Sequence, residues 1–195
     1  MENISAPKKL PNNSELRLLC VGKIDANKNA KSILQAMQIL EKRGISAKLT
    51  IIGQVVDANV QKELSEYKNA EILPYMTKEQ LIDYYRISDL YVMPSIRESF
   101  GRVYAEAMTQ GLPVIYTRGQ GFDGLFADGE VGYAVKPTDC AEIADAIVKF
   151  PIGMKKSPET VWINAANLIG LPLQKDWKIC ISFPLASKDM LFRQM

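Results

Sequence analysis

Short apolar runs of strand length alternate with segments of helical period along most of this chain. Such alternation is typical of β-α-β units, in which a helix returns the chain so that the next strand runs parallel to the last. It predicts an α/β fold: a doubly wound parallel sheet with helices on both faces and a ligand site at the carboxyl ends of the strands. The predicted strands are 17–21, 48–52, 71–73, 90–93, 113–116 and 132–135.

The predicted helices are marked by their ends as well as by their period. The segment 30–43 has an apolar face at helical spacing and is followed by a glycine, a common C-terminal signal. Thr77 and Gln80 have the spacing of a capping box, which predicts a helix after them. Asp139 suits the N-cap of a further helix over 140–150.

The two ends of the chain lack this alternation. Residues 1–14 are polar and contain prolines, and we predict that they form a linker. Residues 15–150 are predicted to form the folded ligand-binding domain. Residues 151–195 are interrupted by prolines and are predicted to form an irregular or helical tail, with a helical pattern only at 159–169. Neither end carries the apolar segment of a signal peptide or of a membrane span.

Composition excludes several classes of function. The 195 residues include 24 basic and 22 acidic side chains, so the net charge is only +2 and no nucleic-acid partner is expected. Three widely spaced cysteines suggest neither a zinc site nor a disulfide framework and favour a reducing compartment. Histidine is absent, which removes the commonest general base and metal ligand. Any chemistry must therefore rest on carboxylates, lysines, hydroxyls and backbone groups.

The segment after the predicted strand 90–93 carries the chemistry. Glu98 and Glu106 have seven residues between them and lie on either side of a Phe-Gly turn that opens a short helix. The first N–H groups of a helix have no partner within it and carry partial positive charge, so the turn 99–103 suits a phosphate. Carboxylates beside it would accept hydrogen bonds from hydroxyls. Together these groups suit a nucleotide diphosphate sugar, which is anionic in the middle and rich in hydroxyls at both ends.

This segment resembles the Glu, seven residues, Glu signature of retaining glycosyltransferases of the GT-B architecture, the glycosyl transferases group 1 that include glycogen and sucrose synthases. In that family the matched region is the C-terminal, donor-binding half of a two-domain enzyme and has a Rossmann-like fold. The chain is too short to hold both halves, so the resemblance implies a missing N-terminal domain. The similarity covers residues 15–150. The matching segments, which occur in the same order as in the family, are 18–23 with Lys28, 49–53, 89–95, the signature itself and 129–133.

By this resemblance Glu98, Lys23 and Lys28 are the catalytic candidates. Glu98 would contact hydroxyls of the transferred sugar, and the two lysines would neutralise the diphosphate and the charge on the departing nucleotide. Glu106 would bind the ribose, and Gly53 and Tyr75 would lie near the base. Neither a metal nor a cofactor is expected beside the nucleotide-sugar donor. The predicted donor site comprises Gly22, Lys23, Lys28, Gly53, Tyr75, Glu98, Ser99, Phe100, Gly101, Val103 and Glu106; core packing is the alternative role for Phe100 and Val103.

Three positions depart from the family pattern. The family more often has arginine at Lys23, glycine at Asn29 and glycine at Pro74. Lysine binds phosphate as a point charge rather than through two parallel hydrogen bonds, and proline has no N–H to donate. We therefore expect these departures to change affinity for the sugar donor rather than the role of the site.

The predicted function is transfer of a sugar from a UDP- or GDP-sugar to a glycan or lipid-linked acceptor, with retention of configuration, by a half-enzyme that is inactive until it is joined to its N-terminal domain. The first alternative is a non-catalytic nucleotide-sugar-binding module. The second is another nucleotide-using α/β protein, but Gly-x-Gly-x-x-Gly is missing after the first strand and no acid/base pair for an epimerase is found. The expected location is cytoplasmic, or peripheral at the inner membrane face in the full enzyme.

Overall fold

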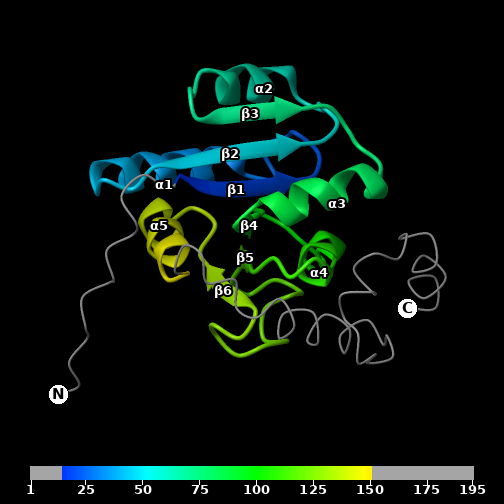
Figure 1. Ribbon diagram of the computed structural model, residues 1–195, viewed down its shortest axis with the longest axis vertical. Helices are drawn as coiled ribbons and strands as arrows, with labels where there is room; N and C mark the ends of the chain where they lie inside the picture. The colour runs from blue at the N-terminus through cyan, green and yellow to red at the C-terminus, as the bar shows by residue number, and fades with distance from the viewer. Residues whose placement is uncertain (1–14, 151–195) are drawn as a thin grey trace.

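A computed structural model describes residues 15–150 of the chain (Figure 1). The predicted linker 1–14 and the predicted tail 151–195, with its helical segment 159–169, lie outside the described residues. In chain order the elements are β1 (Leu16–Val21), α1 (Ala30–Lys42), β2 (Ala47–Ile52), α2 (Ala58–Ser65), β3 (Ala70–Leu73), α3 (Lys78–Ile87), β4 (Leu90–Val92), α4 (Arg102–Thr109), β5 (Val114–Thr117), β6 (Gly132–Val135) and α5 (Cys140–Val148).

The strands form one parallel sheet with the order β3-β2-β1-β4-β5-β6. The chain adds strands outward from β1 to β3, crosses back to place β4 beside β1, and then adds strands in the other direction. A sheet wound in this way has a switch point between β1 and β4, where neighbouring loops leave in opposite directions and ligands commonly bind. The predicted fold class and the predicted strands are confirmed.

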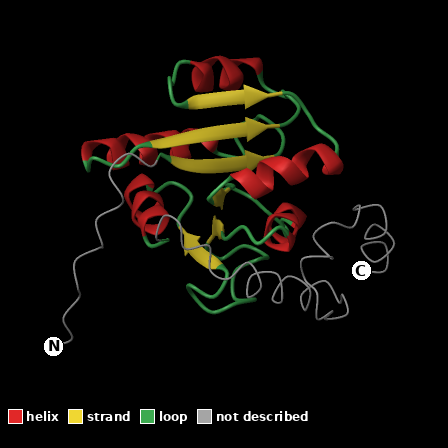
Figure 2. Ribbon diagram, in the orientation of Figure 1, coloured by secondary structure: helices red, strands yellow, loops and turns green. Residues whose placement is uncertain are grey.

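Helices cover both faces of the sheet (Figure 2). On one face α1 packs against α5 and α2, and α3 and α4 cover the other face (Figure 1). Between α4 and the sheet lies a group of aromatic side chains with ring centroids 4.9 to 6.1 Å apart. Its members are Tyr91, Tyr104, Tyr116 and Phe122, and each is at most 1% exposed. This aromatic group packs under the carboxyl ends of the central strands, on the face of the sheet that α4 covers.

Helix caps were predicted well. Thr77 N–H donates to Gln80 Oε1 at 2.9 Å and Gln80 N–H donates to Thr77 Oγ1 at 3.4 Å, so the capping box before α3 is confirmed. Asp139 accepts from the Glu142 N–H at 3.0 Å at the start of α5. That helix ends at Val148 rather than at residue 150.

Helix α2 was not predicted from the sequence. Asp57 caps this helix by accepting from the N–H groups of Asn59 and Val60. Leu64 is the one buried residue of its eight, and Val60 is partly buried against the core. A helix this short, with two apolar contacts, gives too brief a pattern to be recognised in the sequence. Across residues 15–150 the longest helix has 13 residues, and none has the length and hydropathy that a membrane span requires.

Candidate functional site

The predicted site residues follow strands at the carboxyl edge of the sheet. Gly22, Lys23 and Lys28 lie in the loop after β1, and Glu98 to Gly101 lie in the loop after β4. Because β1 and β4 are neighbours in the sheet, these two loops meet at the switch point although they are about 70 positions apart in the chain. Gly53 follows β2 on the other side of β1.

Two glycines allow the loops to approach at backbone distance. A Cβ atom on Gly53 would lie 1.7 Å from the carbonyl oxygen of Gly22, and one on Gly121 would lie 1.5 Å from the carbonyl oxygen of Ser99. Both distances are far shorter than any real contact, so each position requires the absence of a side chain. Backbone packing thus joins the loops after β1 and β2 at one side of the site and those after β4 and β5 at the other.

Gly101 begins α4 for a different reason. It is the N-cap of the helix and has a φ of +73°, in the left-handed region that favours glycine. A Cβ atom there would also lie 2.3 Å from the ring of Tyr104. The turn between Glu98 and α4 is therefore fixed by its glycine, at the start of the short helix that the sequence predicted.

Lys28 and Glu98 form an ion pair at the centre of the site. Lys28 Nζ lies 2.7 Å from Glu98 Oε2, and the two side chains are 21% and 13% exposed. Asp25 Oδ1 accepts from the Lys28 N–H at 3.0 Å, and the Glu98 N–H donates to Gln120 Oε1 at 2.8 Å. The pair is thus held from three loops, and it places one positive charge beside one carboxylate in a partly enclosed position.

Glu106 lies on α4, beside the first turn of α3. Its side chain is 14% exposed, and its Oε1 atom is 3.9 Å from Lys78 Nζ. Lys78 was not among the predicted site residues. A lysine in the first turn of a helix is common on protein surfaces, and the sequence does not indicate which carboxylate it lies beside. The structure therefore places a second carboxylate and lysine together, on the α3 side of the site.

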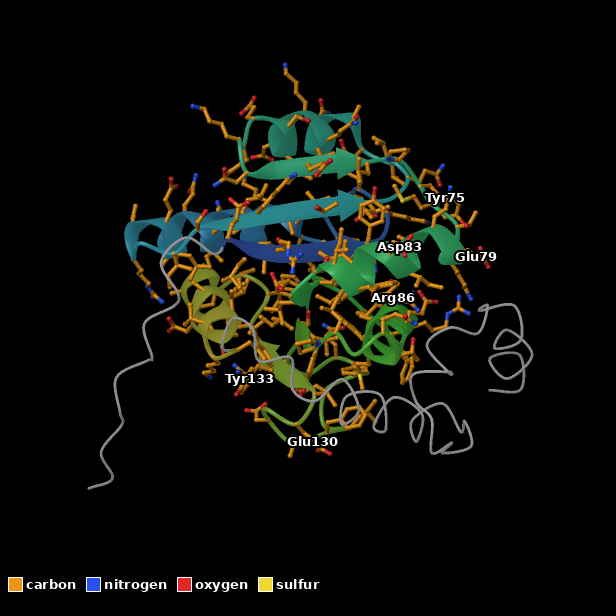
Figure 3. All side chains as sticks on the ribbon, in the orientation of Figure 1. Tyr75, Glu79, Asp83, Arg86, Glu130 and Tyr133 are labelled. Atoms are coloured by element: carbon orange, nitrogen blue, oxygen red, sulfur yellow. The ribbon has the colours of Figure 1, made fainter. Side chains whose placement is uncertain are left out.

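Tyr75 and Lys23 lie outside this cluster. Tyr75 follows β3, is 73% exposed, and is labelled at the outer edge of the molecule in Figure 3. The side chain of Lys23 is exposed. Both residues follow strands at the carboxyl edge of the sheet, and neither is part of the packed interior of the site.

Three further predicted residues belong to the turn before α4 and its first residues. Ser99 is exposed, whereas Phe100 packs edge-on against Phe122 with ring centroids 6.3 Å apart. Val103 is partly buried against the hydrophobic core. Phe100 and Val103 thus make the core contacts given as their alternative role, and they remain close to Gly101 at the start of the helix.

Two buried tyrosines hold the ends of the central strands next to the site. Tyr91 Oη donates to the Val21 carbonyl oxygen at 3.0 Å, and Tyr104 Oη donates to the Met93 carbonyl oxygen at 2.6 Å. Burial raises the pKa of both hydroxyls well above the usual value for tyrosine. Because they stay protonated, they hold the carbonyl groups at the ends of β1 and β4 in place.

Other reactive groups near the site are inert or buried. Burial raises the pKa of the Cys20 thiol to about 12, so its thiolate is not available as a nucleophile. Among the buried side-chain atoms of residues 15–150, Ser95 Oγ and Tyr85 Oη have no hydrogen-bond partner. Over the same residues no group of three or more histidine, cysteine or acidic side chains is placed to hold a metal ion.

The fold and the site together define an α/β ligand-binding domain with charged groups at the switch point of its sheet. A family model of the glycosyl transferases group 1 matches residues 2–160, and the chain belongs to this family. The family match and the fold confirm the resemblance to the C-terminal domain of GT-B glycosyltransferases that the sequence motifs indicated.

Curated relatives and solved structures agree with this membership. The chain is 33% identical over 137 residues to a D-inositol 3-phosphate glycosyltransferase of Pseudarthrobacter chlorophenolicus, covering 66% of this chain and 33% of the relative. It is 30% identical over 154 residues to the capsular polysaccharide biosynthesis glycosyltransferase CapM of Staphylococcus aureus, covering 76% of this chain and 40% of CapM. The crystal structure of Anabaena HepE in complex with UDP and glucose superposes with a TM-score of 0.64 at 21% identity, over 79% of this chain and 43% of HepE. The chain thus spans between a third and two fifths of the length of these curated relatives.

Proposed function

We propose that this chain is the donor-binding domain of a retaining glycosyltransferase, which moves a sugar from a UDP- or GDP-sugar to a glycan or lipid-linked acceptor. The observation that carries the proposal is the Lys28–Glu98 pair, 2.7 Å apart at the switch point of a doubly wound sheet, in a chain of the group 1 family. A cation and a carboxylate side by side suit the place where the diphosphate of a sugar donor meets the hydroxyls of its sugar.

Each candidate residue has a stated role in this proposal. Lys28, assisted by the exposed Lys23, neutralises the diphosphate and the charge that develops on the leaving nucleotide. Glu98 accepts hydrogen bonds from sugar hydroxyls while it holds Lys28 in place. Glu106, beside Lys78, accepts hydrogen bonds from the ribose. The lysines supply the positive charge, so we propose that binding needs no metal ion.

We propose that the site is one wall of a cleft. Four of the six exposed large apolar side chains of residues 15–150 lie in loops at the carboxyl edge of the sheet: Val55, Val56, Tyr75 and Ile96. Lys23, which faces the leaving phosphate in this proposal, is also exposed to water, where its charge is weakened by the high dielectric constant. We propose that an N-terminal domain covers this edge, supplies the acceptor site and excludes water from the reaction.

The location follows from the same proposal. The described cysteines, Cys20 and Cys140, are free, as expected of a protein in a reducing compartment. We propose a cytoplasmic enzyme, with the complete protein peripheral at the inner membrane face when its acceptor is a lipid-linked glycan.

Calorimetry with UDP, GDP and ADP tests the binding site. We expect the 195-residue chain to bind at least one of them, equally well with EDTA or with added Mg²⁺. A hydrogen bond to a charged group contributes roughly 1.5 to 3 kcal/mol, so Glu106→Ala should weaken binding by about ten- to a hundredfold. The matched control is Glu63→Ala, which removes an exposed carboxylate on α2. Absence of binding at millimolar concentration, or equal affinity in Glu106→Ala, would overturn the site.

A transfer assay separates the enzyme from a module that only binds nucleotide sugars. UDP- and GDP-sugars would be supplied with a panel of glycan and lipid-linked acceptors, either to this chain alone or to this chain joined to a group 1 N-terminal domain. We expect product only from the joined protein, with the anomeric configuration of the donor retained by NMR. Transfer by the chain alone would contradict the half-enzyme proposal, and failure of a joined protein that binds the donor would favour the binding module.

A further inference from the structure

Lys28 has an asparagine on each side, and both asparagine side chains reach across to the loop that carries Glu98. Asn27 Nδ2 donates to the Arg97 carbonyl oxygen at 3.0 Å, and Asn27 Oδ1 accepts from the Arg97 N–H at 3.0 Å. The carbonyl oxygen of Asn27 also accepts from the Ile96 N–H at 2.8 Å. One residue of the β1–α1 loop thus makes three hydrogen bonds to two consecutive residues of the β4–α4 loop.

Asn29 joins three loops in a similar way. Its Nδ2 atom donates to the Pro94 carbonyl oxygen at 3.0 Å and to the Pro137 carbonyl oxygen at 2.7 Å, so both of its amide hydrogens are used. Its Oδ1 atom accepts from Ser32 Oγ at 2.8 Å. The loops after β1, β4 and β6 are therefore held together at this one side chain.

The backbone of Asn29 explains why asparagine can replace the more usual glycine here. Its φ of +56° and ψ of +35° lie in the left-handed region, which asparagine tolerates better than other residues with a side chain. Glycine would fit the same backbone but would make none of the three side-chain bonds. The residue thus keeps the turn into α1 and adds a connection between loops.

These bonds bracket the ion pair. Asn27 is tied to residues 96 and 97, Asn29 is tied to Pro94, and Lys28 between them meets Glu98. A long lysine side chain loses much rotamer freedom when it is held in one geometry, and this loss reduces what the ion pair contributes to holding the two loops together. The asparagine bonds fix the backbone on both sides of Lys28, so the side chain starts from a defined position.

We propose that Asn27 and Asn29 are positioning residues, which hold the Lys28 ammonium against Glu98. They thereby keep the ammonium at the place where the diphosphate of the sugar donor binds. This inference rests on the proposed function of Lys28 and Glu98. It assigns to the asparagines a role that acts through Lys28, without contact with the ligand.

The first test is a double-mutant cycle on nucleotide affinity. Asn29→Gly keeps the left-handed backbone and removes only the amide, so the variant should fold. We expect Asn29→Gly to weaken binding of UDP or GDP by about tenfold. This change in affinity corresponds to roughly 1.4 kcal/mol of binding free energy. In a Lys28→Ala background the same change should weaken binding by less than about twofold, because the group that it positions is gone. Asn27→Ala should behave in the same way.

The control removes a bond to the same loop from a different side. Thr117 Oγ1 donates to the Ser95 carbonyl oxygen at 2.7 Å from β5, so Thr117→Val loosens the β4–α4 loop without touching the β1–α1 loop. We expect Thr117→Val to lower the urea midpoint while nucleotide affinity stays within about twofold of wild type. Equal losses of affinity in Thr117→Val and Asn29→Gly would show that the asparagine acts only on general stability.

The second test needs no ligand. The order parameter of the Lys28 ammonium, measured by ¹⁵N relaxation in the full chain, should fall in Asn29→Gly and Asn27→Ala and stay unchanged in Thr117→Val. An unchanged order parameter, or additive effects in the cycle, would overturn the positioning role. Failure of wild-type protein to bind UDP, GDP or ADP would overturn the proposed function instead, and the order parameters would still decide whether the asparagines hold Lys28.

Discussion

The two ends of the candidate site are built differently. At the Lys28–Glu98 end, three loops are joined by an ion pair, two asparagines and Gln120. At the other end Tyr75 is 73% exposed and Val56 is 57% exposed, and both follow strands on the outer side of β1. The domain thus preorganises the end proposed for the diphosphate and leaves the end proposed for the base on an open surface.

Topology accounts for the difference. Lys28 and Glu98 follow β1 and β4, the central strands, so loops from both halves of the sheet surround them. Tyr75 follows β3, an edge strand whose residues are only partly buried. Substitutions at the Lys28–Glu98 end should therefore lower the free energy of unfolding, whereas substitutions at the Tyr75 end should change nucleotide affinity and leave stability nearly unchanged.

The largest effect is expected from Gly121→Ala. The new Cβ would meet the Ser99 carbonyl oxygen at 1.5 Å, so the loops after β4 and β5 would have to separate. We expect the free energy of unfolding to fall by about 3 kcal/mol or more. Gly119→Ala is the matched control, because its φ is +73° but no atom lies within 4 Å of its Cβ, and it should cost about 1 kcal/mol. Equal urea midpoints for the two variants would show that the loops are not packed as described.

A smaller effect is expected from Glu98→Gln. This change leaves the partly buried Lys28 ammonium without its carboxylate, and we expect stability to fall by about 1 to 3 kcal/mol. The control is Glu63→Gln, which breaks the ion pair with Lys31 where both side chains are nearly half exposed, and its melting temperature should not change measurably. If thermal unfolding shows the same change for both variants, the Lys28–Glu98 end is no more tightly built than the surface.

The smallest effect on stability is expected from Tyr75→Ala. An exposed side chain of this kind should change the free energy of unfolding by less than about 0.5 kcal/mol. Affinity for UDP or GDP should nevertheless fall by about threefold to tenfold, as the loss of one aromatic contact with the base would cause. Affinity for inorganic diphosphate should not change. A loss of diphosphate affinity in calorimetry would show that the two ends are not separate.

Much of this fold could be predicted from the sequence, because apolar period and helix caps are local signals. The six strands and the capping box at Thr77 follow from residues that are adjacent or three apart. The helix α2 was missed because Leu64 is its one buried residue. A helix of eight residues is too short for its apolar period to stand out in the sequence.

The candidate site was predictable where it follows the family motif and hidden where it depends on contacts across loops. Glu98, Gly101 and Lys28 stand in recognisable surroundings, and the fold brings them together. The hydrogen bonds of Asn29 to Pro94 and Pro137 join residues 65 and 108 positions apart, and no local pattern encodes them. The one available signal was an asparagine where glycine is usual, because asparagine shares the left-handed backbone with glycine.

One NMR titration tests the central claim that the Lys28–Glu98 end binds the diphosphate of a nucleotide. Amide shifts of the full chain would be followed with inorganic diphosphate and then with UDP and GDP. We expect diphosphate to move the signals of Gly22, Lys28 and Gly101 and to leave that of Tyr75 in place, and a nucleotide to move all four. Shifts confined to the opposite edge of the sheet, around Met37 and Asn69, or none at the Lys28–Glu98 end, would contradict the account.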